Sequence, residues 1–370
     1  MTPSTLRFPL FGLVILMLFA GGWAALQRAG WLLPAPTPTL IGLHGPLMMG
    51  GLFGTLIALE RAVAVAALSR KNWHWAYIAP ALSACGGLIL LVFGAHPAAR
   101  LCLLAGSGGL VLVYAYTAST RHYWSLPTLI LCAGAVFWAL GNLLWVAGQP
   151  LYGVVHGWIA FLILTIVGER LELSRVRRHS TRVERLLMAT ALVYAVGVVV
   201  TVASLEVGVR LAGAGQVLVA LWLLRFDVAG RSVRQTGLTR YIAVCLLTGY
   251  IWLMLGGLLG IMLGAVYAGF QYDAIIHAVA VGFVLSMVFG HAPLIIPALT
   301  GHQVAFRPAF YAPLVLLHLS VLLREYSSLA LNFDGRKWAG ALNASAVLLF
   351  MALVIYAIVT QRSPADRPAA

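Results

Sequence analysis

The chain has 370 residues, of which 62% are hydrophobic and only 9% are charged, with a net charge of +14 and a mean hydropathy of +0.95. Soluble domains carry about 25% charged residues, so this chain has too few charges to cover a water-facing surface. The composition therefore excludes a soluble globular fold and indicates a single transmembrane domain over residues 1–370.

The apolar stretches are long enough to cross a bilayer as helices, since about 20 apolar residues span the hydrocarbon core. They are continuously apolar rather than alternating, which favours helices over a β-barrel. We therefore predict an all-α polytopic membrane protein with about twelve transmembrane helices. In chain order they cover residues 8–27, 38–59, 74–95, 98–118, 125–146, 150–169, 186–204, 208–226, 241–265, 273–298, 308–323 and 338–360.

The first of these stretches resembles a signal peptide in length. It follows a single basic residue, Arg7, lacks a convincing small-x-small cleavage site and is followed by many more spans. We therefore expect it to be a retained helix.

Lysine and arginine give the predicted helices an orientation. With twelve spans, eighteen of the 24 basic residues fall on the side of both termini and six on the other. By the positive-inside rule, both termini are expected in the cytoplasm of a bacterial-type inner membrane. The positive charge is then explained by topology, and no nucleic-acid partner is expected; the lipid bilayer is the expected partner, and the oligomeric state is left open.

Histidines recur at a regular interval along the chain. His44, His156 and His277 are 112 and 121 residues apart, which is four predicted spans each time. A polar residue follows each histidine 13 to 16 positions later, namely Glu60, Glu169 or His291. This spacing predicts a pseudo-threefold repeat of four helices.

The three repeated histidines are expected at one depth. Each lies about four to six residues past the outer end of its helix, which places it roughly 6–9 Å into the membrane. Ionisable residues inside a membrane are functional candidates, and imidazole is a good ligand for iron, copper or zinc. His44, His156, His277 and His291 are therefore candidate metal ligands, with interhelical hydrogen bonding as the alternative. For His291, we expect the helix to break just afterwards, at Pro293 and Pro297.

Two Glu-Arg pairs stand near the inner ends of these helices, Glu60–Arg61 and Glu169–Arg170. Adjacent residues on a helix do not face each other. Each charge is therefore expected to pair with another helix or to reach the inner headgroups. A proton route from the cytoplasm is the alternative.

Three segments resemble the NnrS family. HAVAVGFVLSMVFG, from His277, resembles that family's histidine-containing helix, and HGWIAFLILTIVGER, from His156, is similar to its helix ending in a Gly-Gly-Arg turn. LHGPLMMGG, around His44, is similar to the family's second helix and, more distantly, to the second helix of haem-copper oxidase subunit I. NnrS proteins are polytopic membrane proteins that are linked to nitric oxide metabolism and contain haem and copper.

The resemblance implies that His44 and His277 are the axial ligands of a haem, of b type, and that His156 occupies the place of an oxidase copper ligand. No second histidine lies two positions from His277, and the predicted helix at 186–204 has no histidine pair. The ligand set of a dinuclear oxygen- or NO-reducing centre is thus incomplete, and enzymatic turnover is left open. The glycines that follow His44 and His277 would let a porphyrin, or a neighbouring helix, come close.

The sequence thus favours a haem-binding inner-membrane protein that acts in nitric oxide metabolism or the nitrosative-stress response, with nitric oxide or another small apolar ligand. Two alternatives remain. One is a metal-free secondary transporter or channel, and the other is a structural subunit of a respiratory complex.

Overall fold

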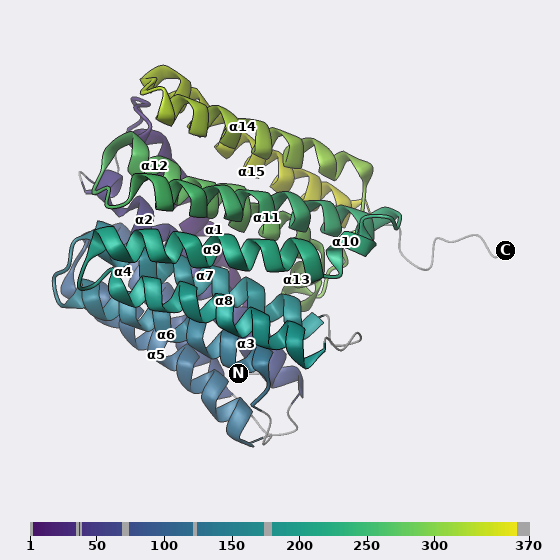
Figure 1. Cartoon of the computed structure of the whole chain (residues 1–370). Helices are drawn as coiled ribbons and strands as arrows, with labels where there is room; N and C mark the ends of the chain where they lie inside the picture. The colour runs from purple at the N-terminus through teal and green to yellow at the C-terminus, as the bar shows by residue number, and fades with distance from the viewer. Residues whose placement is uncertain are drawn as a thin grey trace.

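The computed structural model describes residues 3–34, 37, 39–68, 74–120, 124–173 and 180–360. These residues form helices and connecting loops and no strand, so the predicted all-α class is confirmed. Figure 1 shows the long helices side by side with roughly aligned axes. The α-helices are α1 (Pro3–Arg28), α2 (His44–Pro46), α3 (Thr55–Leu68), α4 (Ile78–Phe93), α5 (Pro97–Thr120), α6 (Leu126–Val146), α7 (Leu151–Leu173), α8 (Thr181–Val200), α9 (Leu205–Phe226), α10 (Ala229–Ser232), α11 (Gly237–Leu263), α12 (Gly269–His277), α13 (Ser286–Thr300), α14 (Tyr311–Leu329) and α15 (Phe333–Val359).

Several short helices join these elements, and two of them are π-helices within long spans. The π-helix η2 (Leu47–Gly54) links α2 to α3, and η5 (Ala278–Leu285) links α12 to α13. The 3₁₀ turns are η1 (Leu40–Leu43), η3 (His74–Tyr77) and η6 (Pro308–Phe310). The second and tenth predicted helices are therefore composite, each with a π segment in its middle.

Eleven helical stretches in the described part of the chain are long and apolar enough to cross a membrane. They match eleven of the twelve predicted spans, including the one at 208–226, which is α9 (Leu205–Phe226). The multi-pass membrane architecture follows from them.

The remaining predicted span, at 308–323, falls on α14 (Tyr311–Leu329), which lies along α15 in Figure 1. This helix does not belong to the eleven apolar stretches. Its C-terminal turns contain Arg324 and Glu325, and both side chains are turned into the protein. The lower hydropathy of α14 thus reflects polar residues that face the bundle.

The spans that contain the three repeated histidines are the most enclosed. Leu40–Ala67 and Gly269–Thr300 each have 61% of their apolar window buried and Leu151–Leu173 has 78%, whereas the other spans reach at most 56%. Consecutive helices such as α4 and α5, α6 and α7, and α8 and α9 pack closely against each other. Three inner helices at the predicted interval fit the four-helix period, although the threefold repeat itself stays a prediction.

Helix α13 corrects one expectation from the sequence. Pro293 and Pro297 do not end the helix after His291, because α13 continues through both of them to Thr300. Gly301 then ends it in the left-handed conformation, with φ 79°. Each proline removes one donor from the helix without breaking it here, since the neighbouring helices support the segment.

Some of the basic residues that gave the predicted orientation lie outside the described residues. They are Arg70, Lys71, Arg121, Arg175, Arg177, Arg178, Arg362 and Arg367.

Candidate functional site: a histidine pair between the second and tenth spans

The structure brings His44 and His277 together. Their ring centroids are 6.1 Å apart and their planes differ by 6°. His44 begins α2 and His277 ends α12, so both rings are placed by the N-terminal part of the two composite helices. This contact puts the two residues at the same level of the bundle, as predicted, and their depth in the membrane stays a prediction.

Both histidines lie within three residues of the start of a π-helix. The segment η2 begins three residues after His44, and η5 begins at the residue after His277. A π-helix has a wider turn than an α-helix, and π segments inside α-helices occur frequently at functional sites. Pro46, which has no N–H to donate, precedes η2 and favours departure from the regular hydrogen-bond pattern there.

A hydrogen bond fixes the orientation of each ring. The Nδ1 of His44 donates to the carbonyl oxygen of Gly21 in α1 at 2.9 Å, and the Nδ1 of His277 donates to the carbonyl oxygen of Asp273 at 2.9 Å. With the proton on Nδ1, Nε2 of each ring has its lone pair available. No hydrogen bond from a described residue occupies either Nε2. Metal-binding histidines are commonly held in this way, through the nitrogen that does not bind the metal.

A chain of polar side chains supports His277. One carboxylate oxygen of Asp273 lies 3.4 Å from its Nδ1. The same carboxylate accepts two hydrogen bonds from Arg324 of α14, at 2.7 and 2.9 Å. Arg324 also donates to the side-chain oxygen of Asn343 in α15 at 3.3 Å. Three helices thus hold the imidazole in place.

Sequence reasoning did not find Asp273 or Arg324. Asp273 precedes His277 by four residues, which is the spacing of side chains on one helix face, so this signal was present in the sequence. Arg324 gave no such signal, because its partner is on another helix.

The separation of the two rings fits a shared metal ion. Imidazole nitrogen binds a transition metal such as zinc at about 2.0–2.1 Å, which places the centres of two rings on opposite sides of one ion about 6 Å apart. Gly42 and Gly45, on either side of His44, have no atom within 4 Å of the position where a Cβ would lie. The two imidazoles and the spacing of their rings therefore fit a pair of protein ligands to one metal ion, such as a haem iron.

The other glycines of these helices have a different role. A Cβ at Gly50 would meet Leu103, one at Gly54 would meet Trp138, and one at Gly282 would meet Trp252. The sequence suggested that these glycines admit either a porphyrin or a neighbouring helix, and the structure shows that they pack against neighbouring helices.

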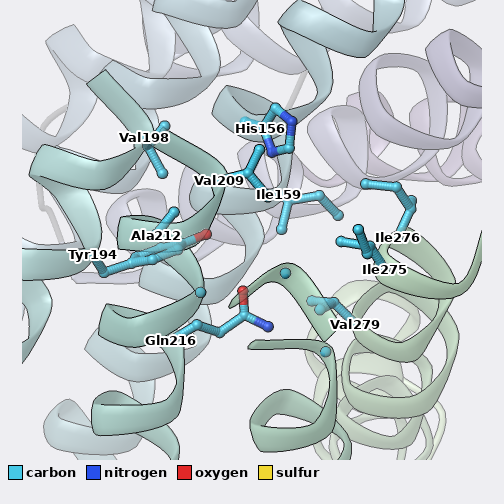
Figure 2. Close-up of a pocket in the computed structure, with 13 residues that line it drawn as sticks. His156, Ile159, Tyr194, Val198, Val209, Ala212, Gln216, Ile275, Ile276 and Val279 are labelled. Carbon is cyan, nitrogen blue, oxygen red and sulfur yellow. The ribbon is translucent and has the colours of Figure 1, made fainter. Parts of the chain in front are cut away.

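His156 lies apart from the pair and lines a small cavity of about 30 Å³ (Figure 2). The cavity is enough for one or two water molecules and far too small for a haem macrocycle. Ile275, Ile276 and Val279 of the tenth span line it. These residues lie on either side of His277 in the sequence, so His156 is level with His277 along the bundle. His156 nevertheless faces a different side of the tenth span from His44.

Figure 2 also shows Tyr194 and Gln216 at the wall of this cavity. The amide nitrogen of Gln216 donates to the carbonyl oxygen of Leu253 at 2.9 Å. No group of three His, Cys, Asp or Glu side chains that could hold a metal ion occurs in the described part of the chain. The described residues therefore do not give His156 the further ligands that a copper site of three side chains would need.

His291 is buried in α13. Its Nδ1 donates to the carbonyl oxygen of Met287 at 2.8 Å, and its Nε2 has no partner among the described residues. It follows His277 by fourteen residues on the same composite helix and does not join the pair. His318 of α14 accepts a hydrogen bond from the indole of Trp252 at 3.0 Å.

The arginines near the C-terminal ends of α3 and α7 are paired, as expected. Arg170 forms a two-point ion pair with Asp227, at 3.0 and 3.1 Å, and their side chains are 7% and 2% exposed. Arg61 lies 3.5 Å from Glu172 and over the ring of Tyr114.

Glu60 and Glu169 are half-buried at the same end of the bundle and interact electrostatically with each other and with Arg61. The pair Arg61–Glu172 links α3 to α7, and the pair Arg170–Asp227 links α7 to the turn between α9 and α10. The partners Glu172 and Asp227 were not identified from the sequence.

Comparison with known protein families assigns the chain to one of them. The model of a domain of unknown function, DUF8744, matches residues 7–359, which is nearly the whole chain. The chain belongs to the DUF8744 family. No curated protein matches it. The DUF8744 domain thus includes all the helices described above, apart from the first four residues of α1.

Proposed function

We propose that this protein binds a b-type haem between His44 and His277 in the bacterial inner membrane and acts in nitric oxide metabolism or the response to nitrosative stress. The pair of nearly parallel rings, 6.1 Å apart, is the observation on which the proposal depends. The resemblance of the three histidine segments to the NnrS family supplies the link to nitric oxide.

The protein's own residues have three tasks in this proposal. Nε2 of His44 and of His277 would bind the iron. Gly21 and Asp273 would keep both rings in the metal-binding tautomer through their carbonyl oxygens. Asp273 and Arg324 would hold the ring of His277 against rotation.

The ligand would arrive through the bilayer. Nitric oxide is small and apolar, so it dissolves in the hydrocarbon and needs no water-filled channel. A haem held here would supply reversible one-electron chemistry, and the two histidines with their supporting hydrogen bonds would tune its potential. A diatomic molecule would bind the iron only by displacing one of the two histidines. Copper is not assigned a place, because the described residues around His156 do not form a ligand set.

The first experiment is a measurement of haem in the purified protein. A pyridine haemochrome spectrum is expected to show b-type haem, and metal analysis of the same sample would count iron and copper. His44→Ala and His277→Ala are each expected to remove most of the haem. His156→Ala is the matched control and is expected to retain it, since His156 lies in a separate cavity.

Two results would overturn the proposal. One is a wild-type protein, produced with sufficient haem supply, that contains no haem. The other is a full haem content in both the His44→Ala and the His277→Ala variant.

A further inference from the structure

Three polar side chains from three helices meet at the cavity beside His156. His156 of α7, Tyr194 of α8 and Gln216 of α9 all line it. Figure 2 shows the hydroxyl of Tyr194 and the amide of Gln216 directed into the space between these helices, with the ring of His156 at its edge. The His44–His277 pair uses none of these groups, so the arrangement described above leaves them without a role.

Each of the three side chains offers a hydrogen-bonding atom that no described residue satisfies. The amide nitrogen of Gln216 donates to the carbonyl oxygen of Leu253 at 2.9 Å, which fixes the side chain and leaves its Oε1 available to accept. The hydroxyl of Tyr194 and both ring nitrogens of His156 form no hydrogen bond with a described residue. Tyr194 and Gln216 are only 2% and 7% exposed, so their polar atoms have little contact with bulk solvent.

Polar atoms in this situation favour an occupant that forms hydrogen bonds. A buried polar group without a partner is destabilising. Such groups are usually satisfied by ordered water, which forms two to four hydrogen bonds, whereas the cavities that stay dry are apolar. Three unsatisfied groups around one cavity provide the partners that a bound water molecule needs.

The size and lining of the cavity limit what it can hold. Its volume of about 30 Å³ is enough for one or two molecules of the size of water. The rest of the lining is aliphatic side chains and glycines, and no Asp, Glu, Lys or Arg of the described residues contributes to it. An ion would therefore lack a counter-charge, which makes its transfer into the cavity costly, whereas water needs none.

We propose that this cavity is a water-binding site, in which His156, Tyr194 and Gln216 together hold one or two water molecules inside the membrane-spanning bundle. The water donates a hydrogen bond to Oε1 of Gln216 and exchanges hydrogen bonds with the hydroxyl of Tyr194 and the imidazole of His156. Because these side chains belong to α7, α8 and α9, the bound water joins three helices. The site needs no metal and does not depend on the proposed haem function.

The first test detects the water in the purified full chain. X-ray radiolysis converts bound water into hydroxyl radicals, which oxidise the side chains next to it, and mass spectrometry then locates the added oxygen. Tyr194 is expected to be oxidised several times faster than Tyr241 and Tyr250, which are as fully buried but do not line the cavity.

The second test asks whether the polar side chains hold the water. Tyr194→Phe keeps the ring and removes the hydroxyl, and His156→Leu removes both ring nitrogens. Each variant is expected to slow the oxidation of Ile159, which lines the same cavity. Tyr241→Phe is the matched control, because it removes a buried hydroxyl away from the cavity, and it should leave the oxidation of Ile159 unchanged.

Oxidation of Tyr194 that is no faster than that of Tyr241 and Tyr250 in the wild type would overturn the proposal, because the cavity would then be dry. Undiminished oxidation of Ile159 in both Tyr194→Phe and His156→Leu would also overturn it, because the water would then not be held by these groups. Neither result bears on whether the chain contains haem, so this site and the proposed function are tested separately.

Discussion

Asp273 of α12 accepts two hydrogen bonds from Arg324 of α14 while its backbone carbonyl oxygen holds Nδ1 of His277. The two charged side chains are 14% and 12% exposed, so the pair is largely shielded from water. One residue thus fixes both the tautomer of a histidine and the position of a neighbouring helix. Removing its charge should therefore affect ligand binding at the histidine pair.

Asp273→Asn is expected to weaken haem binding about 10- to 100-fold, the usual effect of removing a group that orients a metal-binding histidine. Titration of haem into haem-depleted protein would measure the change. Asp334→Asn is the control, since its carboxyl is exposed. Unchanged affinity in a well-folded Asp273→Asn protein would show that the carboxylate does not orient His277.

Gly54→Ala should destabilise the bundle, because the added Cβ would overlap the indole of Trp138. Overpacking of this kind costs about 1–3 kcal/mol. Thermal unfolding in detergent, followed by intrinsic tryptophan fluorescence, would measure it. Gly108→Ala, in α5, is the control with no atom within 4 Å of the new Cβ. Equal unfolding temperatures for the two variants would contradict the role assigned to Gly54.

Arg170→Met should strongly destabilise the fold, because it leaves the buried carboxylate of Asp227 without its counter-charge. Breaking a buried pair by removing one partner costs about 3–5 kcal/mol. Adding Asp227→Asn to Arg170→Met should recover part of the loss in unfolding temperature. Glu206–Arg210 is an exposed pair, and Arg210→Gln should stay near wild type. A double variant less stable than Arg170→Met would count against an uncompensated charge as the cause.

The orientation inferred from basic residues is testable with reporter fusions. The segment around α10, between α9 and α11, is expected in the cytoplasm because it contains Arg225, Arg231, Arg234 and Arg240. The turn between α8 and α9 is expected on the opposite side. A phosphatase fused within this turn should be active, and one fused after α10 should be inactive. The reverse pattern would invert the proposed topology.

The sequence by itself determined that this chain lies in a membrane and where its helices run. Hydropathy is a local property, and a stretch of about 20 apolar residues specifies a span without reference to its neighbours. The same local reading placed His44, His156 and His277 at one depth, because depth depends only on distance from a helix end. It also indicated that Arg61 and Arg170 would find partners on other helices, without identifying them.

Only the tertiary structure decided which histidines face each other. The direction of a side chain depends on the rotation of its helix, which close packing against other helices sets, as at Gly54 with Trp138 and at Gly282 with Trp252. The π-helices η2 and η5 also shift the helical period within the two spans of the pair, so a period of 3.6 residues does not predict their faces. For that reason His44 and His277 meet, His156 lies in a cavity of its own, and the partners Asp273 and Arg324 became visible only in three dimensions.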